Sequence, residues 1–315
     1  MSDDVVTGPP SGILVVDKPR GPTSHDVVAR LRRVLRVRAV GHAGTLDPMA
    51  TGVLVVAVGE ATKLVPWLSS ATKVYEATVA LGVETDTLDA HGREVRRAPV
   101  PAEVLAALAD PVGAAGAPLV QQALDGELAR TSQIPPAYSA IHTDGVRAFV
   151  RARRGETPVM APREVSVASL ALVGARAEPP SLDLAMQVSK GYYVRSFAHD
   201  LAERLGTVGH LARLHRTRSG CFTIAEAAPL EGSADDLRAR IVPLARAAAR
   251  ALVIARLTET GVRDARFGRT IAPGDVRTSS PPNAPCAWLD PDEALVAVGH
   301  LDEDGRGHVI RGFVT

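Results

Sequence analysis

The sequence predicts an α+β fold in which one large domain is followed by a small β domain. Apolar runs of strand length at 11–19 and 52–58 alternate along the chain with amphipathic helical stretches. From about residue 256 the pattern changes to short segments split by Gly, Pro and acidic turns. With 315 residues, of which 46% are hydrophobic, the chain is long enough to bury a sizeable core.

The first elements follow from local signals. The apolar run 11–19 predicts a strand that stops at Pro19, and Thr23 or Ser24 then caps a helix with an apolar stripe on one face. The Val/Leu run after Gly52 predicts a buried strand ending at Gly59. Strict alternation over 73–85 predicts a strand with one inward face, made of Tyr75, Ala77, Val79, Leu81 and Val83.

The remaining pattern predicts helices at 101–110, 117–129, 193–206 and 235–253, with strands at 163–175 and 182–191. Residues 132–156 are proline-broken and then basic, which indicates a surface excursion. We therefore expect a large domain over 10–250 that contains this insertion, and a small β domain over 256–315, near the lower size limit for independent stability.

Composition restricts the protein class. Two cysteines are too few for a disulfide framework, no apolar run reaches the length of a membrane span, and the short acidic N-terminus is unlike a targeting peptide. These features predict a cytoplasmic protein with reduced thiols and no membrane contact. The net charge is only +1, but arginine-rich stretches such as 30–38, 147–155 and 213–220 favour a polyanionic partner. Any one such stretch taken alone is more typical of a solvated helix face.

The stretch GHAGTLDPMATG (41–52) carries a single carboxylate, Asp47, in a glycine-rich turn before a buried strand. An isolated Asp-Pro pair is most often just a turn. Here the glycines admit close approach, and a carboxylate on a rigid turn is well placed to act as a nucleophile or base. No second acid is apparent beside Asp47. The chain lacks HExxH, CxxC, P-loop and GxGxxG patterns, so we expect neither a metal nor a cofactor.

Extended from this turn, the segment 41–64 resembles the signature of the bacterial tRNA pseudouridine-55 synthases, the TruB family. Four further blocks resemble those of the family and occur in its order, over roughly residues 12–225. They are LVVDKPRGPTSHDVV (14–28), KVYEATVALGVETDTLDAHG (73–92), SKGYYVRSFAHDLAERLG (189–206) and VGHLARLHRTRSG (208–220).

The resemblance implies a pseudouridine-synthase fold, with a mixed, mainly antiparallel central sheet flanked by helices and a PUA-like C-terminal RNA-binding domain. The implied reaction breaks the N1–C1′ bond of a tRNA uridine, turns the base and joins C5 to C1′. No atoms are lost and no redox change occurs, which agrees with the missing cofactor motifs.

The resemblance also implies the catalytic residues. Asp47 corresponds to the catalytic aspartate, Arg195 to the active-site arginine and Tyr75 to the tyrosine that stacks on the target base. Three roles remain open for the carboxylate: attack at C1′, proton abstraction at C2′ and addition at C6. Without the resemblance, Arg195 is more typical of a surface ion pair and Tyr75 of a core residue.

Chemistry on a base in a folded loop requires that the base leave its stack. By resemblance, His42 enters the vacated place and Leu214 packs against the flipped base, although each is also typical of ordinary packing. Lys18 and Pro19 are implied to buttress the site. The same resemblance makes Lys63 and Tyr192 supporting or RNA-contacting residues.

The implied partner is the T arm of tRNA, with the small domain reaching the acceptor end, and we expect a monomer. Two other classes remain open. One is an RNA-binding protein that assists tRNA folding, with or without catalysis. The other is an Asp-nucleophile hydrolase, which needs a second acid or a metal to activate water.

Overall fold

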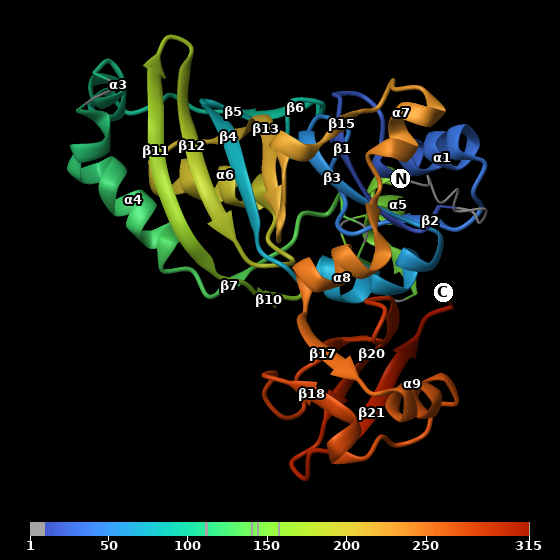
Figure 1. Cartoon of the computed structure of the whole chain (residues 1–315). Helices are drawn as coiled ribbons and strands as arrows, with labels where there is room; N and C mark the ends of the chain where they lie inside the picture. Colours follow the sequence, from blue (N-terminus) through green and yellow to red (C-terminus); the bar gives the residue numbers. More distant parts are fainter. Residues whose placement is uncertain (1–9, 111–112, 140, 144, 157, 315) are drawn as a thin grey trace. The chain divides into compact units, whose positions relative to one another are not determined.

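The structure is a computed structural model that describes residues 10–110, 113–139, 141–143, 145–156 and 158–314 (Figure 1). The N-terminal residues 1–9, on which the expectation about targeting rested, lie outside the described residues. The chain forms two compact units. The first unit comprises the chain up to Leu46, Val53–Ser70 and the chain from Gly220, and the second comprises Asp47–Gly52 and Ala71–Ser219.

The second unit is built on a sheet with the order β11-β12-β4-β13, in which every neighbouring pair is antiparallel. Residues Thr51–Gly52, at the start of β3, pair with β13 in parallel. Helices α3 and α4 pack against β11, and α6 packs against β13 and β4. The main elements are α3 (Ala102–Leu108), α4 (Pro118–Leu128), α6 (Val194–Arg204), β4 (Lys73–Leu81), β11 (Val167–Ala177), β12 (Pro180–Val188) and β13 (Gly209–Ser219).

Short elements complete the second unit. They are β5 (Val83–Thr85), β6 (Glu94–Arg97), β7 (Ser132–Gln133), β8 (His142–Thr143), β9 (Val146–Arg147), α5 (Ala148–Arg153) and β10 (Arg163–Glu164), with a 3-10 turn at Ala114–Gly116. Strands β7 and β10 pair with each other, so the start of the predicted excursion, at Ser132–Gln133, lies beside Arg163–Glu164. Residues 140 and 144 within that excursion lie outside the described residues.

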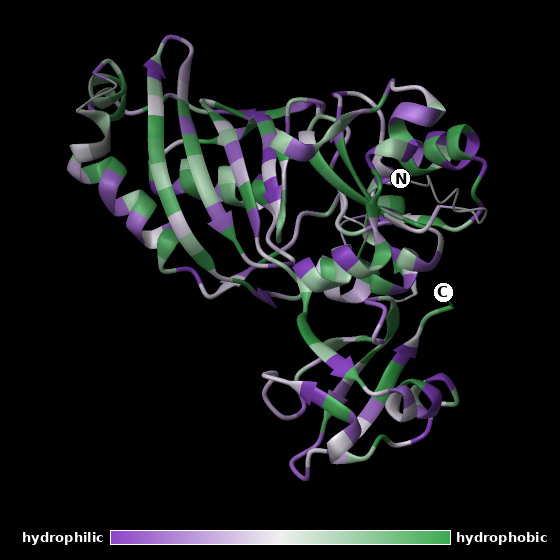
Figure 2. Cartoon of the chain, viewed as in Figure 1, coloured by the Kyte–Doolittle hydropathy of each residue, from purple (hydrophilic) through white to green (hydrophobic). Residues whose placement is uncertain are grey.

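The alternation predicted for 73–85 is confirmed over β4, where Tyr75, Ala77, Val79 and Leu81 are buried. Figure 2 shows the mixture of hydrophobic and hydrophilic residues along this strand. Val83 does not continue it but starts β5, because Gly82 has a φ of +90° and turns the chain.

The first unit contains a sheet with the order β3-β1-β15, to which β2 and β16 also pair. As predicted, Thr23 caps the first helix, and it forms a capping box with Asp26. The elements are β1 (Gly12–Lys18), α1 (Ser24–Leu35), β2 (Val40–His42), β3 (Thr51–Val58), a 3-10 turn at Gly59–Leu64, α2 (Val65–Ser69), β14 (Phe222–Thr223), a 3-10 turn at Ile224–Glu226, β15 (Ala228–Pro229), α7 (Ala234–Ala239), β16 (Val242–Pro243) and α8 (Leu244–Ala251).

The expectation of one helix over 235–253 is wrong. Helix α7 ends at Ala239 and α8 starts at Leu244, because Pro243 has no N–H to continue a helix. The chain between them instead forms β16, which pairs with β1 through Pro243 and Gly12.

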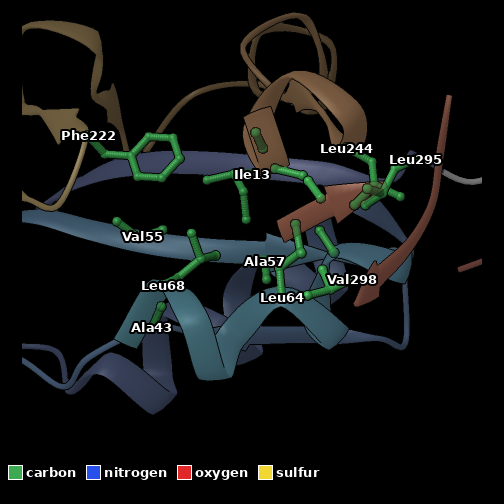
Figure 3. Close-up of a cluster of buried hydrophobic side chains, with 14 of the residues drawn as sticks. Ile13, Ala43, Val55, Ala57, Leu64, Leu68, Phe222, Leu244, Leu295 and Val298 are labelled. Carbon is green, nitrogen blue, oxygen red and sulfur yellow. The ribbon is translucent and has the colours of Figure 1, made fainter. Parts of the chain in front are cut away.

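The C-terminal residues form their own sheet, with the order β18-β17-β19-β20-β21. Its hydrophobic residues Leu289, Leu295 and Val298 join one buried cluster with Ile13, Leu64 and Leu244 (Figure 3). The elements are β17 (Val253–Leu257), α9 (Glu259–Arg266), a 3-10 turn at Pro273–Asp275, β18 (Val276–Thr278), β19 (Cys286–Leu289), β20 (Leu295–Leu301) and β21 (Gly307–Gly312).

The predicted α+β class is confirmed, because mixed sheets and packed helices occur together and the C-terminal residues form a separate sheet. Among the described residues, no helix is both long enough and apolar enough to span a bilayer.

Candidate active site

The turn that carries Asp47 is attached directly to the sheet of the second unit. The Ala50 N–H donates to the Asp47 carbonyl at 3.1 Å, which closes the turn. Gly52 has a φ of +97°, and a Cβ at this position would lie 2.3 Å from the carbonyl oxygen of Arg216 on β13. Glycine is therefore required for the chain to lie this close to β13.

Arg195 projects from the first turn of α6 and engages both oxygens of Asp47. Its Nε lies 2.8 Å from Oδ2, and its Nη2 donates to Oδ1 at 3.2 Å. The Arg195 side chain is 6% exposed, whereas that of Asp47 is 32% exposed. The guanidinium thus neutralises the carboxylate from the buried side, while the carboxylate remains open to a substrate.

Two backbone carbonyls hold the guanidinium in place. Nη1 of Arg195 donates to the carbonyl of Thr87 at 3.1 Å, and Nη2 donates to that of Tyr138 at 2.9 Å. These contacts come from two loops that are far from α6 in sequence. The planar fork of arginine can satisfy all of these acceptors at once, which a lysine ammonium cannot.

A second acid, Asp89, lies beside the same guanidinium, so the expectation that none accompanies Asp47 is wrong. Its Oδ2 is 3.8 Å from Nε of Arg195, and its side chain is 9% exposed. Its Oδ1 accepts from the Thr87 hydroxyl at 2.7 Å and from the His91 N–H at 3.0 Å. Leu88, which lies between Thr87 and Asp89 in the sequence, has a φ of +61°. This is a strained backbone conformation of the kind that clusters at functional sites.

Tyr75 and Leu214 lie on neighbouring strands of the same sheet. Arg216 on β13 is the Cα partner of both Gly52 on β3 and Tyr75 on β4, so Tyr75 lies two strands from the Asp47 turn. Leu214 pairs with Ala77, two residues further along each strand. Tyr75 and Leu214 are both buried, which confirms the predicted inward position of Tyr75.

The two tyrosines that precede α6 have different environments. Tyr192 is buried with its ring 6.4 Å from that of Phe197, and burial together with the charge of Glu127 raises the pKa of its phenol. Burial also raises the pKa of the Tyr193 phenol, on which the charges of Arg163, Arg195 and Asp47 act as well. Of the two tyrosines, Tyr193 is therefore the one whose pKa depends on the charges of Asp47 and Arg195. The sequence interpretation missed it.

The other predicted site residues, Lys18, Pro19, His42 and Lys63, belong to the first unit. Lys18 is fully buried and donates to the carbonyl of Pro19 at 2.9 Å. The His42 ring meets that of His25 edge to face, with 5.3 Å between ring centroids. Lys63 donates to Glu60 at 2.6 Å and to the Gly312 carbonyl at 3.2 Å.

Within the described ranges, no group of three or more His, Cys, Asp or Glu side chains has the arrangement of a metal site. Cys221 and Cys286 are free thiols, and Cys286 is buried where it accepts a hydrogen bond from the Trp288 indole at 3.1 Å. The site thus consists of the partly exposed Asp47 carboxylate, the buried Arg195 guanidinium and the buried carboxylate of Asp89.

Comparison with known proteins gives consistent matches. The model of the N-terminal domain of the TruB family of pseudouridylate synthases matches residues 32–194. A tRNA pseudouridine synthase B from Thermobifida fusca (strain YX) is 42% identical over 293 residues, covering 91% of this chain and 93% of the relative. One from Leifsonia xyli subsp. xyli (strain CTCB07) is 41% identical over 290 residues, covering 91% and 92%.

Among solved structures, an H/ACA RNP bound to a substrate RNA containing 2′-deoxyuridine includes a chain with the same fold. The TM-score is 0.70 at 22% sequence identity, covering 96% of this chain and 85% of that chain. At this identity the likeness concerns the fold.

Proposed function

The chain belongs to the TruB family of pseudouridylate synthases, and from this premise we propose how its residues isomerise the T-loop uridine at position 55 of tRNA to pseudouridine. In this reaction the N1–C1′ bond breaks, C5 bonds to C1′, and the proton on C5 is replaced by one on N1. The observation that carries the proposal is the ion pair between Asp47 and Arg195, with the carboxylate partly open and the guanidinium buried.

Asp47 is the catalytic carboxylate, and Arg195 orients it and supplies the opposite charge. Each of the three possible first steps, attack at C1′, removal of the C2′ proton and addition at C6, requires an ionised carboxylate. A bidentate guanidinium supplies the counter-charge without taking up space on the open side of Asp47. Asp89, whose Oδ1 accepts from Thr87 and His91, helps to orient the guanidinium through Oδ2, which lies 3.8 Å from Nε of Arg195.

Tyr75 stacks on the target base, and Leu214 packs against the base once it has left the T loop. Their inward positions on adjacent strands β4 and β13 support these roles. His42 fills the place that the uridine leaves, since a flat ring can both stack and donate hydrogen bonds. Lys18, Pro19 and Tyr192 support the site, and Lys63 contacts RNA after exchanging its Glu60 partner for phosphate.

The excursion over 132–156 contacts the T arm. Arg147, Arg153 and Arg154 are exposed in this segment and supply positive charge for phosphates. We assign the large domain to 10–250 and a PUA-like RNA-binding role, directed at the acceptor end, to 256–315. The protein acts as a monomer in the cytoplasm, where its tRNA substrate is found.

The test uses a tRNA transcript labelled with tritium at C5 of uridine, because the product has the same mass as the substrate. We expect wild-type protein to release tritium and Asp47→Asn to release none while still binding the tRNA. Asn preserves the size of the side chain and removes its charge. Turnover by Asp47→Asn would show that another group performs the chemistry.

A further inference from the structure

Gln133 makes two hydrogen bonds to the backbone of Tyr193. Its Nε2 donates to the Tyr193 carbonyl at 3.0 Å, and its Oε1 accepts from the Tyr193 N–H at 2.8 Å. The Gln133 residue is 2% exposed. A buried amide that satisfies both backbone groups of one residue fixes that residue in both position and orientation.

Tyr193 is the N-cap of α6, and Arg195 is the second residue of that helix. The Tyr193 side chain makes no capping hydrogen bond, so the start of α6 depends on other groups. The Tyr193 carbonyl also accepts the first helical bond, from the Phe197 N–H at 3.1 Å. Gln133 therefore acts on the turn from which the Arg195 side chain projects.

The segment after Gln133 continues along the same turn of α6. The Ser196 hydroxyl donates to the carbonyl of Ile134 at 2.9 Å, and Arg195 donates to the carbonyl of Tyr138. Gln133 also lies in β7, where it pairs with Arg163 of β10, so the start of the excursion is joined to the strand that follows it. One short stretch of chain thus connects the excursion to the catalytic ion pair.

We propose that Gln133 is a positioning residue for the isomerisation, which holds the first turn of α6 so that Arg195 meets both oxygens of Asp47. This inference rests on the proposed function of Asp47 and Arg195. Gln133 touches neither Asp47 nor the substrate in this role. Its effect reaches the reaction through the backbone of Tyr193, and displacement of a catalytic group by about 1 Å is enough to cost roughly 100-fold in rate.

Two variants separate the two hydrogen bonds. Gln133→Met keeps the approximate size of the side chain and removes both bonds. Gln133→Glu keeps the acceptor for the Tyr193 N–H and loses the donor to the Tyr193 carbonyl whenever the carboxyl is ionised. The matched control is Gln121→Met, because Gln121 is an exposed glutamine of α4 whose amide donates to Asp125 of the same helix.

Single-turnover tritium release with enzyme in excess measures the chemical step, and filter binding measures tRNA affinity. We expect Gln133→Met to lower the single-turnover rate roughly 10- to 100-fold with tRNA affinity within about twofold of wild type. Gln121→Met should match wild type in both. The rate of Gln133→Glu relative to wild type should rise from pH 8 to pH 6, because a protonated carboxyl regains the donor and burial favours protonation.

A Gln133→Met rate within twofold of wild type, or a defect only in tRNA affinity, would overturn the positioning role. A ratio of Gln133→Glu to wild type that stays flat with pH would also overturn it, and this arm remains decisive if Gln133→Met does not fold. Absence of tritium release by the wild type would instead contradict the proposed function. The two failures are therefore distinct.

Discussion

Asp47 and Arg195 lie 148 residues apart in sequence, yet they meet through both carboxylate oxygens, at 2.8 and 3.2 Å. The same guanidinium also bonds the carbonyls of Thr87 and Tyr138. This contact therefore connects the Asp47 turn, the Thr87 loop and the start of α6. The planar geometry of the Arg195 guanidinium, and not its charge alone, determines the orientation of the Asp47 carboxylate.

Arg195→Lys should reduce the single-turnover rate by roughly 100-fold, although it keeps the positive charge. A lysine ammonium cannot contact both oxygens of Asp47 and the two carbonyls at once. The matched control is Arg204→Lys, on the same helix but 44% exposed, which should retain the wild-type rate. Tritium release under single-turnover conditions measures both. Equal rates for the two lysine variants would argue that charge alone is sufficient.

Asp89→Asn should lower the single-turnover rate by roughly 10-fold, because Arg195 is oriented less well. The melting temperature should change little. The amide oxygen can still accept from Thr87 and His91, whereas the charge 3.8 Å from Arg195 is lost. Asp89→Ala should in addition lower the melting temperature, because it leaves the Thr87 hydroxyl and the His91 N–H without this acceptor. Similar melting temperatures for the two variants would show that the hydrogen bonds contribute little.

Asp47 could be singled out from its glycine-rich turn, whereas Arg195 was predicted only from the resemblance of 189–206 to the TruB family. The strand faces also followed from alternation, as the buried Tyr75 and Leu81 on β4 confirm. Asp89, Gln133 and Tyr193 were missed as site residues because their significance depends on contacts between distant segments. Gln133 and Tyr193, for example, are 60 residues apart. The periodicity of a single segment does not predict a contact between residues that are distant in the sequence.

Local sequence patterns also gave wrong predictions where pairing between distant segments determined the structure. The alanine-rich stretch 235–253 has strong helix propensity, yet Pro243 interrupts it and pairs with Gly12. The acidic stretch that contains Asp89 has the composition of an exposed loop. Asp89 is nevertheless buried, and its backbone forms an isolated β-bridge with Leu211 of β13.

Gly52→Ala should destabilise the fold by about 2–3 kcal/mol and disturb the Asp47 turn. The added Cβ would lie 2.3 Å from the Arg216 carbonyl oxygen, at a φ of +97° that favours glycine. The matched control is Gly116→Ala, where the added methyl would meet nothing within 4 Å. Urea unfolding compares the two variants. If Gly52→Ala unfolded at the same urea concentration as wild type, Gly52 and Arg216 could move apart without a loss of stability.

Glu127→Gln should destabilise the fold by roughly 3 kcal/mol, because it removes the charge from a fully buried carboxylate. Glu127 bonds Arg130 at 2.7 Å and Arg204 of α6 at 2.8 Å, and so connects α4 to α6. Glu94→Gln, at an exposed ion pair with Arg97, is the control and should cost little. Urea unfolding at pH 7 is the measurement. Equal costs would indicate that Arg130 is held adequately by Asp200 alone.

Lys73 should make stability increase with pH above about 8. Burial, together with the charges of Arg216 and Lys190, lowers the pKa of Lys73 from 10.5 to about 8. Between these values the unfolded chain binds this proton and the folded chain does not, so raising the pH favours the folded state. Below pH 8 both states are protonated and the contribution is constant. Wild type should therefore gain stability relative to Lys73→Met between pH 8 and pH 10, as measured by urea unfolding. A difference that does not change over this range would mean that the Lys73 ammonium stays charged in the folded protein.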